Sequence, residues 1–202
     1  YFCTRMKKAE RTRQSIIEKT AVLFNTKGFE GTTLQDLTAC TGLTKGALYG
    51  NFKDKEEIAT EAFRYAVQKS RQALRDEMDK HTSIKKKVFA FLDFYARFVF
   101  ASRIAGGCPI LNAAIEVDDY RTHMRKVVAK EASDILQSLT TLLEEGIASG
   151  EFKREMKCKE IATILFCNIE GALMMARLER SDDSMKYIVQ HCKNVVNQYL
   201  IK

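Results

Sequence analysis

Proline is almost missing from this chain. Pro109 is the only one in 202 residues, and ten glycines are the other strong helix breakers. An all-β fold needs many turns, whereas so few breakers over this length favour long helices. Apolar residues recur at helical spacing through most of the segments between the breakers. We therefore predict an all-α protein of about nine helices.

Two short helices are predicted close to the N-terminus, after a longer helix that stops near Gly28. Thr33 can cap the first short helix, over residues 34–40, and Thr44 can cap the second, over residues 45–51. The turn between them is tight and contains a glycine. Two helices of two turns each, joined in this way, are typical of a helix-turn-helix motif.

The second short helix has the character of a helix that enters a DNA groove. The major groove is about 12 Å wide and admits one α-helix, which must be held firmly on the face that does not read the bases. In the stretch TGLTKGALYGNF, the anchoring residues are Ala47, Leu48 and Phe52, and the outward residues are Thr44, Lys45, Tyr49 and Asn51. Gly46 costs about 1 kcal/mol of helix stability against alanine, and it is useful where the backbone must approach another surface closely.

The charge of the chain suits an anionic partner. The formal net charge is +7 and the isoelectric point is about 9.1, a balance that favours nucleic acid among possible partners. From Arg5 to Lys53 there are nine basic and four acidic residues, a difference of +5. Most of the excess positive charge therefore lies in the first quarter of the chain.

Residues 28–58, GFEGTTLQDLTACTGLTKGALYGNFKDKEEI, resemble the N-terminal module of the TetR family of transcriptional repressors. The matching features are Gly28-Phe29, Thr32-Thr33, Thr44-Lys45-Gly46, Leu48-Tyr49, Phe52 and Lys55-Glu56. The resemblance implies a three-helix DNA-binding module over residues 6–53 and a helical ligand-sensing and dimerisation domain over residues 54–202. It also implies a homodimer paired through the last two helices, a palindromic double-stranded DNA operator, and release by an unknown small-molecule effector.

The resemblance assigns DNA contacts to Thr33, Thr44, Lys45, Gly46, Tyr49, Asn51 and Lys55. Thr33, at a helix start, and Lys55 would each bind a phosphate. Thr44 and Lys45 would open the recognition helix, with Lys45 reaching a guanine edge or a phosphate. Gly46 would let the helix seat deeply, and Tyr49 would contact a phosphate or a thymine methyl group. Asn51 stands where the family commonly has histidine. Diffuse attraction would come from Lys7, Lys8, Arg11 and Arg13.

The larger helical part is expected to hold an effector pocket. Aromatic and methionine side chains suit a yielding apolar cavity, and the candidates are Phe94, Tyr95, Phe98, Met124, Phe166 and Met174. A redox-responsive regulator is an alternative, because Cys108 falls at a predicted helix start and a helix N-terminus lowers a thiol pKa. A small buried cysteine at a tight junction is the other interpretation of Cys108.

Other functional classes find little support in the sequence. The three histidines form no metal-binding or nucleophile–base pattern, and the six cysteines form no zinc pattern. We therefore predict no enzymatic activity, no cofactor and no metal. We find no apolar secretory segment and no run of about 18 uncharged apolar residues, so a cytoplasmic protein with reduced thiols is expected.

The opening residues, YFCTR, are interpreted as an addition before a natural start at Met6. The alternative to a DNA-binding regulator is a helical protein-binding adaptor without DNA activity. A regulator should lose affinity for duplex DNA steeply as salt rises, whereas an adaptor should show no such binding.

Overall fold

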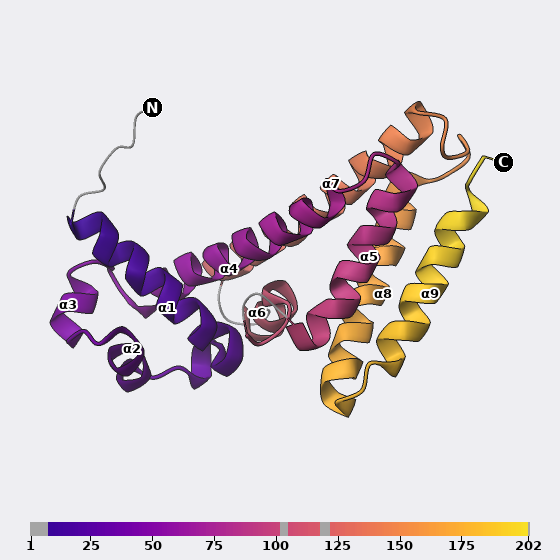
Figure 1. Cartoon of the computed structure of the whole chain (residues 1–202). Coiled ribbons are helices and arrows are strands. Elements are labelled where there is room, and N and C mark those ends of the chain that lie inside the picture. The colour runs from indigo at the N-terminus through magenta and orange to yellow at the C-terminus, as the bar shows by residue number, and fades with distance from the viewer. Residues whose placement is uncertain (1–7, 102–104, 118–121, 202) are drawn as a thin grey trace. The chain divides into compact units, whose positions relative to one another are not determined.

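The computed structural model describes residues 8–101, 105–117 and 122–201, with the side chains of 98–101 and 122 left aside. Over these ranges the chain forms nine helices and no strand (Figure 1). One isolated β-bridge pairs Phe152 with Leu200. The helices are α1 (Lys8–Gly31), α2 (Leu34–Thr41), α3 (Lys45–Tyr49), α4 (Lys55–Met78), α5 (Ile84–Ala101), α6 (Pro109–Val117), α7 (Thr122–Ala148), α8 (Cys158–Glu179) and α9 (Asp183–Gln198). The predicted all-α fold is confirmed. Lys7 and the predicted start at Met6 lie outside the described residues.

The helices gather into two compact units. Unit 1 comprises Tyr1–Lys69 and Ile104–Val128, and unit 2 comprises Ser70–Arg103 and Ala129–Lys202. The long helices α4 and α7 each contribute to both units. The predicted boundary between residues 53 and 54 does not coincide with the division between the two packed units, and it stays a prediction.

The first helix is broken where the sequence predicts its end. Gly28 has φ 76° and ψ 174°, outside helical geometry, and glycine reaches positive φ without the steric cost that other residues meet. The helix continues to Gly31, so α1 has a kink at the residue where the sequence predicts its end. Phe29 follows the kink, is buried, and stacks on Phe24 with ring centroids 6.2 Å apart.

Each of the first four helices contributes a fully buried aliphatic residue to unit 1. These residues are Ile16 of α1, Leu37 of α2, Leu48 of α3 and Ile58 of α4, all at most 1% exposed. The helices α2 and α3, with eight and five residues, are too short to be stable alone in water. Their stability must therefore come from this burial and from their caps.

Three helices of unit 2 lie side by side, namely α5, α8 and α9 (Figure 1). On α8 the buried face includes Leu165, Ile169 and Leu173, all fully buried. Among the described residues α8 alone is long and apolar enough to cross a membrane, but half of its apolar window is buried in the protein. That burial is what the core helix of a helical bundle requires.

The start of α5 is held by a carboxylate from the turn between α7 and α8. Glu151 accepts hydrogen bonds from Ser83 Oγ at 2.7 Å, from Ile84 N at 2.8 Å and from Lys85 N at 3.1 Å. Ser83 Oγ also accepts from Lys86 N at 3.4 Å, so Ser83 caps the start of α5. The carboxylate satisfies backbone N–H groups that a helix start leaves without intrahelical partners.

Candidate nucleic-acid interface

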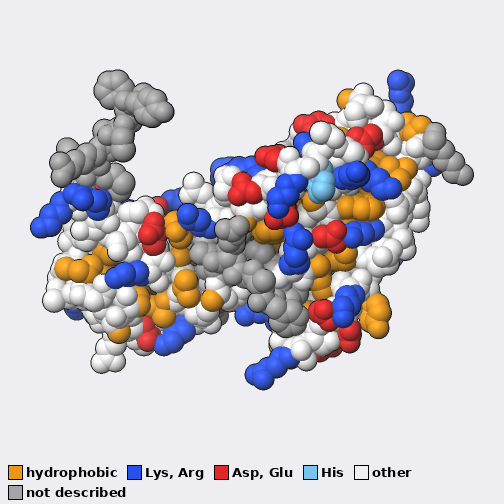
Figure 2. Space-filling view, viewed as in Figure 1, with side chains coloured by type: hydrophobic (Ala, Val, Ile, Leu, Met, Phe, Trp, Pro, Cys, Tyr) orange, Lys and Arg blue, Asp and Glu red, His pale blue; other side chains and the backbone are white. Residues whose placement is uncertain are grey.

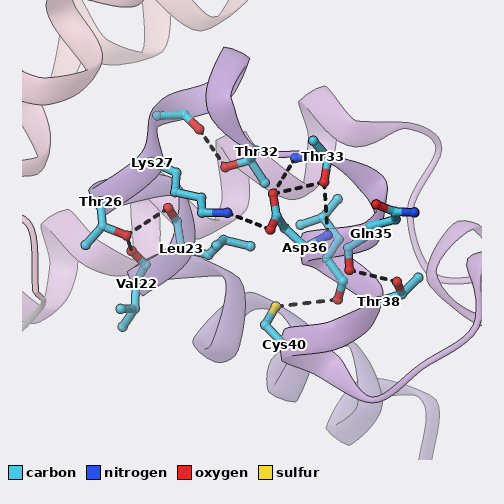
Figure 3. A network of polar contacts seen from close by, with 12 residues as sticks. Val22, Leu23, Thr26, Lys27, Thr32, Thr33, Gln35, Asp36, Thr38 and Cys40 are labelled. Carbon is cyan, nitrogen blue, oxygen red and sulfur yellow. Dashed lines mark hydrogen bonds and ion pairs between the residues drawn. The ribbon is translucent and has the colours of Figure 1, made fainter.

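The start of α2 is fixed by a reciprocal capping box. Thr33 Oγ1 accepts from Asp36 N at 3.1 Å, and Asp36 Oδ2 accepts from Thr33 N at 2.9 Å (Figure 3). Asp36 Oδ1 also accepts a hydrogen bond from Lys27 Nζ of α1 at 2.6 Å. The hydrogen bond from Lys27, followed by those from Thr33, lowers the pKa of Asp36 to about 2. The capping box and the ion pair therefore fix the position of the exposed Thr33 relative to the end of α1.

The helix α3 is anchored on one side as the sequence predicts. Thr44 Oγ1 accepts from Ala47 N at 3.2 Å and caps the helix start. Leu48 and Phe52 are 0% and 2% exposed, and Ala47 is half-buried. The buried side chains and the cap hold this five-residue helix from two sides.

The opposite side of α3 faces outward. Thr44, Lys45 and Gly46 are exposed, and Tyr49 is 36% exposed. A Cβ atom built on Gly46 would meet nothing within 4 Å. Packing inside the chain therefore does not require glycine at this position, and a close approach by another molecule gives it a physical reason.

Two predicted contact residues also have partners within the chain. Asn51 is half-buried, and its Nδ2 donates to Ala47 O at 2.8 Å. Lys55 Nζ lies 4.2 Å from the centroid of the Phe29 ring, a cation–π geometry. Both side chains are thus oriented by unit 1 itself. The sequence pattern did not indicate either interaction.

The cationic residues near the start of α1 fall into two groups. Lys8 and Arg11 are exposed and line an open groove that continues to Thr41 and Leu43 at the turn after α2. Arg13, in contrast, is held by contacts with the segment after α3. The sequence alone places Arg13 among the diffuse charges, because its partners lie 38 and 44 residues away in the chain.

Hydrogen bonds from α6 and the turn before it hold the end of α1, next to the start of α2. Glu116 Oε2 accepts from Phe29 N at 2.6 Å. Asn112 Nδ2 donates to Asn25 O at 3.0 Å and to Gly106 O at 2.7 Å. Asn25 Nδ2 in turn donates to Ala105 O at 2.8 Å. These bonds tie the last turns of α1 to α6 within unit 1, and no pattern within one segment of the sequence predicts them.

Those predicted effector-pocket residues whose side chains the structure describes lie in both units. Phe94, Tyr95 and Phe166 are buried in unit 2, and Phe94 and Tyr95 pack edge to face with centroids 5.7 Å apart. Met124 is buried in unit 1, where it lines a small apolar cavity with residues of α1, α4 and α6. Met174 is 41% exposed on α8. The side chain of Phe98 lies outside the described residues.

The exposed face of α8 is uncharged through its middle. Its exposed residues from 163 to 175 are Thr163, Cys167, Gly171, Met174 and Met175. A Cβ atom on Gly171 would meet nothing within 4 Å. Further along, Leu178 of α8 is 73% exposed, and Tyr187 of α9 is 74% exposed. Exposed apolar groups that gather on one surface mark interaction sites more often than singly scattered ones do.

The remaining candidate chemistry of the chain is limited. Cys108 directly precedes α6, as predicted, and is 4% exposed. Such burial opposes the attack of a bulky oxidant on its sulfur. Within 8–101, 105–117 and 122–201, no group of three His, Cys, Asp or Glu residues is placed to hold a metal ion.

Lys and Arg side chains are interspersed with acidic ones over much of the face drawn in Figure 2.

Both parts of the chain match known families. Residues 16–62 match the family described as bacterial regulatory proteins of the tetR family, and residues 85–192 match the tetracyclin repressor-like C-terminal domain. A solved TetR-family transcriptional regulator from Cytophaga hutchinsonii is 32% identical, with a TM-score of 0.92, over 98% of this chain and 100% of that one.

Two other similar proteins carry informative names. The HTH-type transcriptional repressor DhaR of Mycobacterium sp. strain GP1 is 20% identical over 86% of each chain. A cysteine mutant of the TetR family regulator CifR, solved in complex with a 26-bp double-strand operator DNA, is 19% identical, with a TM-score of 0.82 over 91% of this chain and 95% of that one. At this identity CifR shows a shared fold.

The second of two adjacent short helices is capped, anchored on one face and exposed on its polar face. This arrangement defines a helix-turn-helix DNA-binding protein. The chain belongs to the TetR family of transcriptional regulators. It is a transcriptional regulator with a helix-turn-helix DNA-binding domain. An adaptor without DNA activity does not fit this membership.

Proposed function

We propose that this protein is a homodimeric repressor that binds a palindromic DNA operator and is released by a small-molecule effector. The observation that carries the proposal is the outward face of α3, which offers Lys45, Gly46 and Tyr49 while Leu48 is fully buried. Two such helices in a dimer would enter successive major grooves about 34–36 Å apart. One helix alone contacts too few base pairs for operator selectivity.

The proposed DNA contacts divide into positioning and reading residues. Thr33 at the start of α2 and Lys55 at the start of α4 would bind phosphates, which fix the register of the protein on the duplex. Lys45 and Tyr49 would reach base edges, a phosphate or a thymine methyl group. Thr44 opens the helix, and Asn51 has an amide that can donate a further hydrogen bond. Residues 6–53 would form the DNA-binding domain.

The proposed dimer interface lies on the last two helices. Cys167, Gly171, Met174 and Leu178 follow one face of α8 at spacings of three and four residues and are exposed. In a two-fold symmetric dimer this face would meet its own copy, so an uncharged surface avoids the repulsion between identical charges. Met174 would then serve the dimer rather than the effector pocket for which the sequence proposed it.

The effector is proposed to act on the domain formed by residues 54–202. A ligand that binds one arrangement of the two DNA-binding heads more tightly than another lowers operator affinity by that difference. The buried aromatic residues Phe94, Tyr95 and Phe166 are candidates for its surroundings, together with Phe98 and Met124. We further propose a cytoplasmic location and no enzymatic activity, in keeping with a regulator that acts on DNA.

The test begins with selection of bound duplexes from a random pool by the purified protein. We expect a two-fold symmetric consensus whose recovery falls steeply as salt rises. Candidate small molecules are then added to the complex with the selected duplex, and release is followed by fluorescence anisotropy. A consensus without internal symmetry would contradict the dimeric reading of DNA.

A further inference from the structure

The guanidinium of Arg13 makes three contacts with the segment that follows α3. Its Nη1 donates to Asn51 O at 2.6 Å, and its Nη2 donates to Glu57 Oε1 at 2.8 Å. Its Cζ lies 4.0 Å from the centroid of the Phe52 ring. The planar group is thus held on two edges and one face, a geometry that only arginine provides.

These contacts continue to the last turn of α3. Glu57 Oε2 accepts from Lys53 N at 2.7 Å, so one carboxylate binds both Arg13 and the backbone between α3 and α4. Asn51, whose carbonyl accepts from Arg13, donates its side-chain amide to Ala47 O at 2.8 Å. A polar chain therefore runs from α1 to the end of the recognition helix.

The ion pair lies half-buried above a buried aromatic ring. The side chains of Arg13 and Glu57 are 35% and 37% exposed, and Phe52 beneath the guanidinium is 2% exposed. Hydrogen bonds from Lys53 N and then from Arg13 lower the pKa of Glu57, so the carboxylate is ionised at neutral pH. Charge-assisted hydrogen bonds of this kind are stronger than neutral ones and fix geometry.

We propose that Arg13 is a positioning residue for DNA recognition, which sets the placement of α3 through Asn51, Phe52 and Glu57. The inference rests on the proposed role of α3 as the helix that reads the operator. Arg13 acts through α3 and does not contact DNA. The competing role is a direct contact between Arg13 and a phosphate, as expected for a cation near the start of α1.

The two roles predict different responses to salt. A phosphate contact releases counterions, so its removal lowers the slope of log affinity against log salt by about 0.9 per contact, or about 1.8 for a dimer that loses one in each subunit, and weakens all duplexes alike. Loss of a positioning contact leaves that slope unchanged and weakens the correct sequence most, because misplaced side chains no longer meet their bases. The ratio of specific to non-specific affinity therefore separates the roles.

The experiment measures affinity by fluorescence anisotropy over a series of salt concentrations. The probes are the duplex selected by the wild-type protein and a scrambled duplex of equal length and composition. The variants are Arg13→Lys, Arg13→Gln and Glu57→Gln, and the matched controls are Arg11→Lys and Arg11→Gln, which alter an exposed cation two residues away. Circular dichroism and thermal unfolding establish that each variant is folded at the temperature of the assay.

We expect Arg13→Lys and Arg13→Gln to lower the ratio of selected to scrambled affinity by about tenfold, the usual worth of a charge-assisted bond. Their salt slopes should match the wild type. Glu57→Gln, which keeps Arg13, should lower the ratio by a smaller factor. Arg11→Gln should weaken both duplexes alike, and Arg11→Lys should change neither.

Two results would overturn the proposal. One is wild-type selectivity in Arg13→Lys or in Glu57→Gln. The other is a reduced salt slope in Arg13→Gln with equal loss on both duplexes. A separate variant, Lys45→Ala, tests the proposed interface itself. Unchanged binding of Lys45→Ala to the selected duplex would refute base or phosphate contact by that residue, whatever the Arg13 variants do.

Discussion

The helices α3 and α8 each expose a glycine whose Cβ position is open, yet the surfaces around the two glycines are opposite in kind. Gly46 lies between Lys45 and the partly exposed Tyr49 on a helix of five residues. Gly171 lies between Cys167 and Met174 on a helix of 22 residues. Neither glycine is required by packing within the chain. The comparison suggests close approach of an anionic polymer at α3 and of a second apolar surface at α8.

The largest effect is expected from a charge placed on α8. Met174→Glu would put two like charges near the two-fold axis of the proposed dimer, at a cost of several kcal/mol. We expect a monomer by analytical ultracentrifugation and at least about a hundredfold loss of operator affinity. Glu145→Lys, which changes an exposed charge on α7, is the matched control and should stay dimeric. A dimeric Met174→Glu protein would remove α8 from the interface.

The outward residues of α3 should respond to truncation without any change in oligomeric state. Lys45→Ala and Tyr49→Ala are each expected to cost about 1–3 kcal/mol of affinity for the selected duplex if the side chains read bases. Sedimentation should show the wild-type dimer in both. Lys126→Ala, which removes an exposed cation of α7, serves as the control. Equal losses on selected and scrambled duplexes would reassign Lys45 and Tyr49 to phosphate contacts.

The two glycines offer the sharpest comparison between the faces. Gly46→Ala and Gly171→Ala should each stabilise their helices, by up to about 1 kcal/mol, because the added methyl group meets nothing inside the chain. Gly46→Ala should weaken operator binding by about 1–3 kcal/mol, the cost of overfilling a close contact, with dimerisation unchanged. Gly171→Ala should weaken dimerisation instead. If either variant affected the other property more, the assignment of the two faces would be wrong.

The smallest effect concerns the charge at the start of α2. In the folded protein the pKa of Asp36 is lowered to about 2, whereas an unfolded aspartate titrates near 3.9. A depressed pKa stabilises the fold above the unfolded pKa, and this contribution is lost as pH falls from about 4 to about 2. Thermal unfolding should show Asp36→Asn less stable than the wild type at pH 6, with the difference shrinking over that window. A constant difference would show that the carboxylate charge has no role.

Local features of the fold could be predicted from the sequence because their causes are local. Thr33 and Thr44 cap the helices that follow them, Pro109 opens α6, and Leu48 and Phe52 are buried. Each depends on a side chain and backbone groups only a few residues away, or on an apolar spacing.

The interactions that the sequence analysis missed join residues far apart in the chain. Arg13 binds groups 38 and 44 residues away, and Glu116 binds the N–H of Phe29, 87 residues away. No pattern within one segment predicts such a pair, because it depends on how the helices pack. The exposure of Met174 on α8 shows a related limit. On a helix with two apolar faces, the spacing of apolar residues does not tell which face packs inside the chain.

The central claim is that two copies of α3 read one operator together. The most direct measurement is sedimentation equilibrium of the protein with the selected duplex, combined with hydroxyl-radical footprinting of both strands. We predict two chains per duplex and two protected half-sites whose centres are about 10–10.5 bp apart, or a multiple of that spacing. One chain bound to a single unrepeated site would contradict the account.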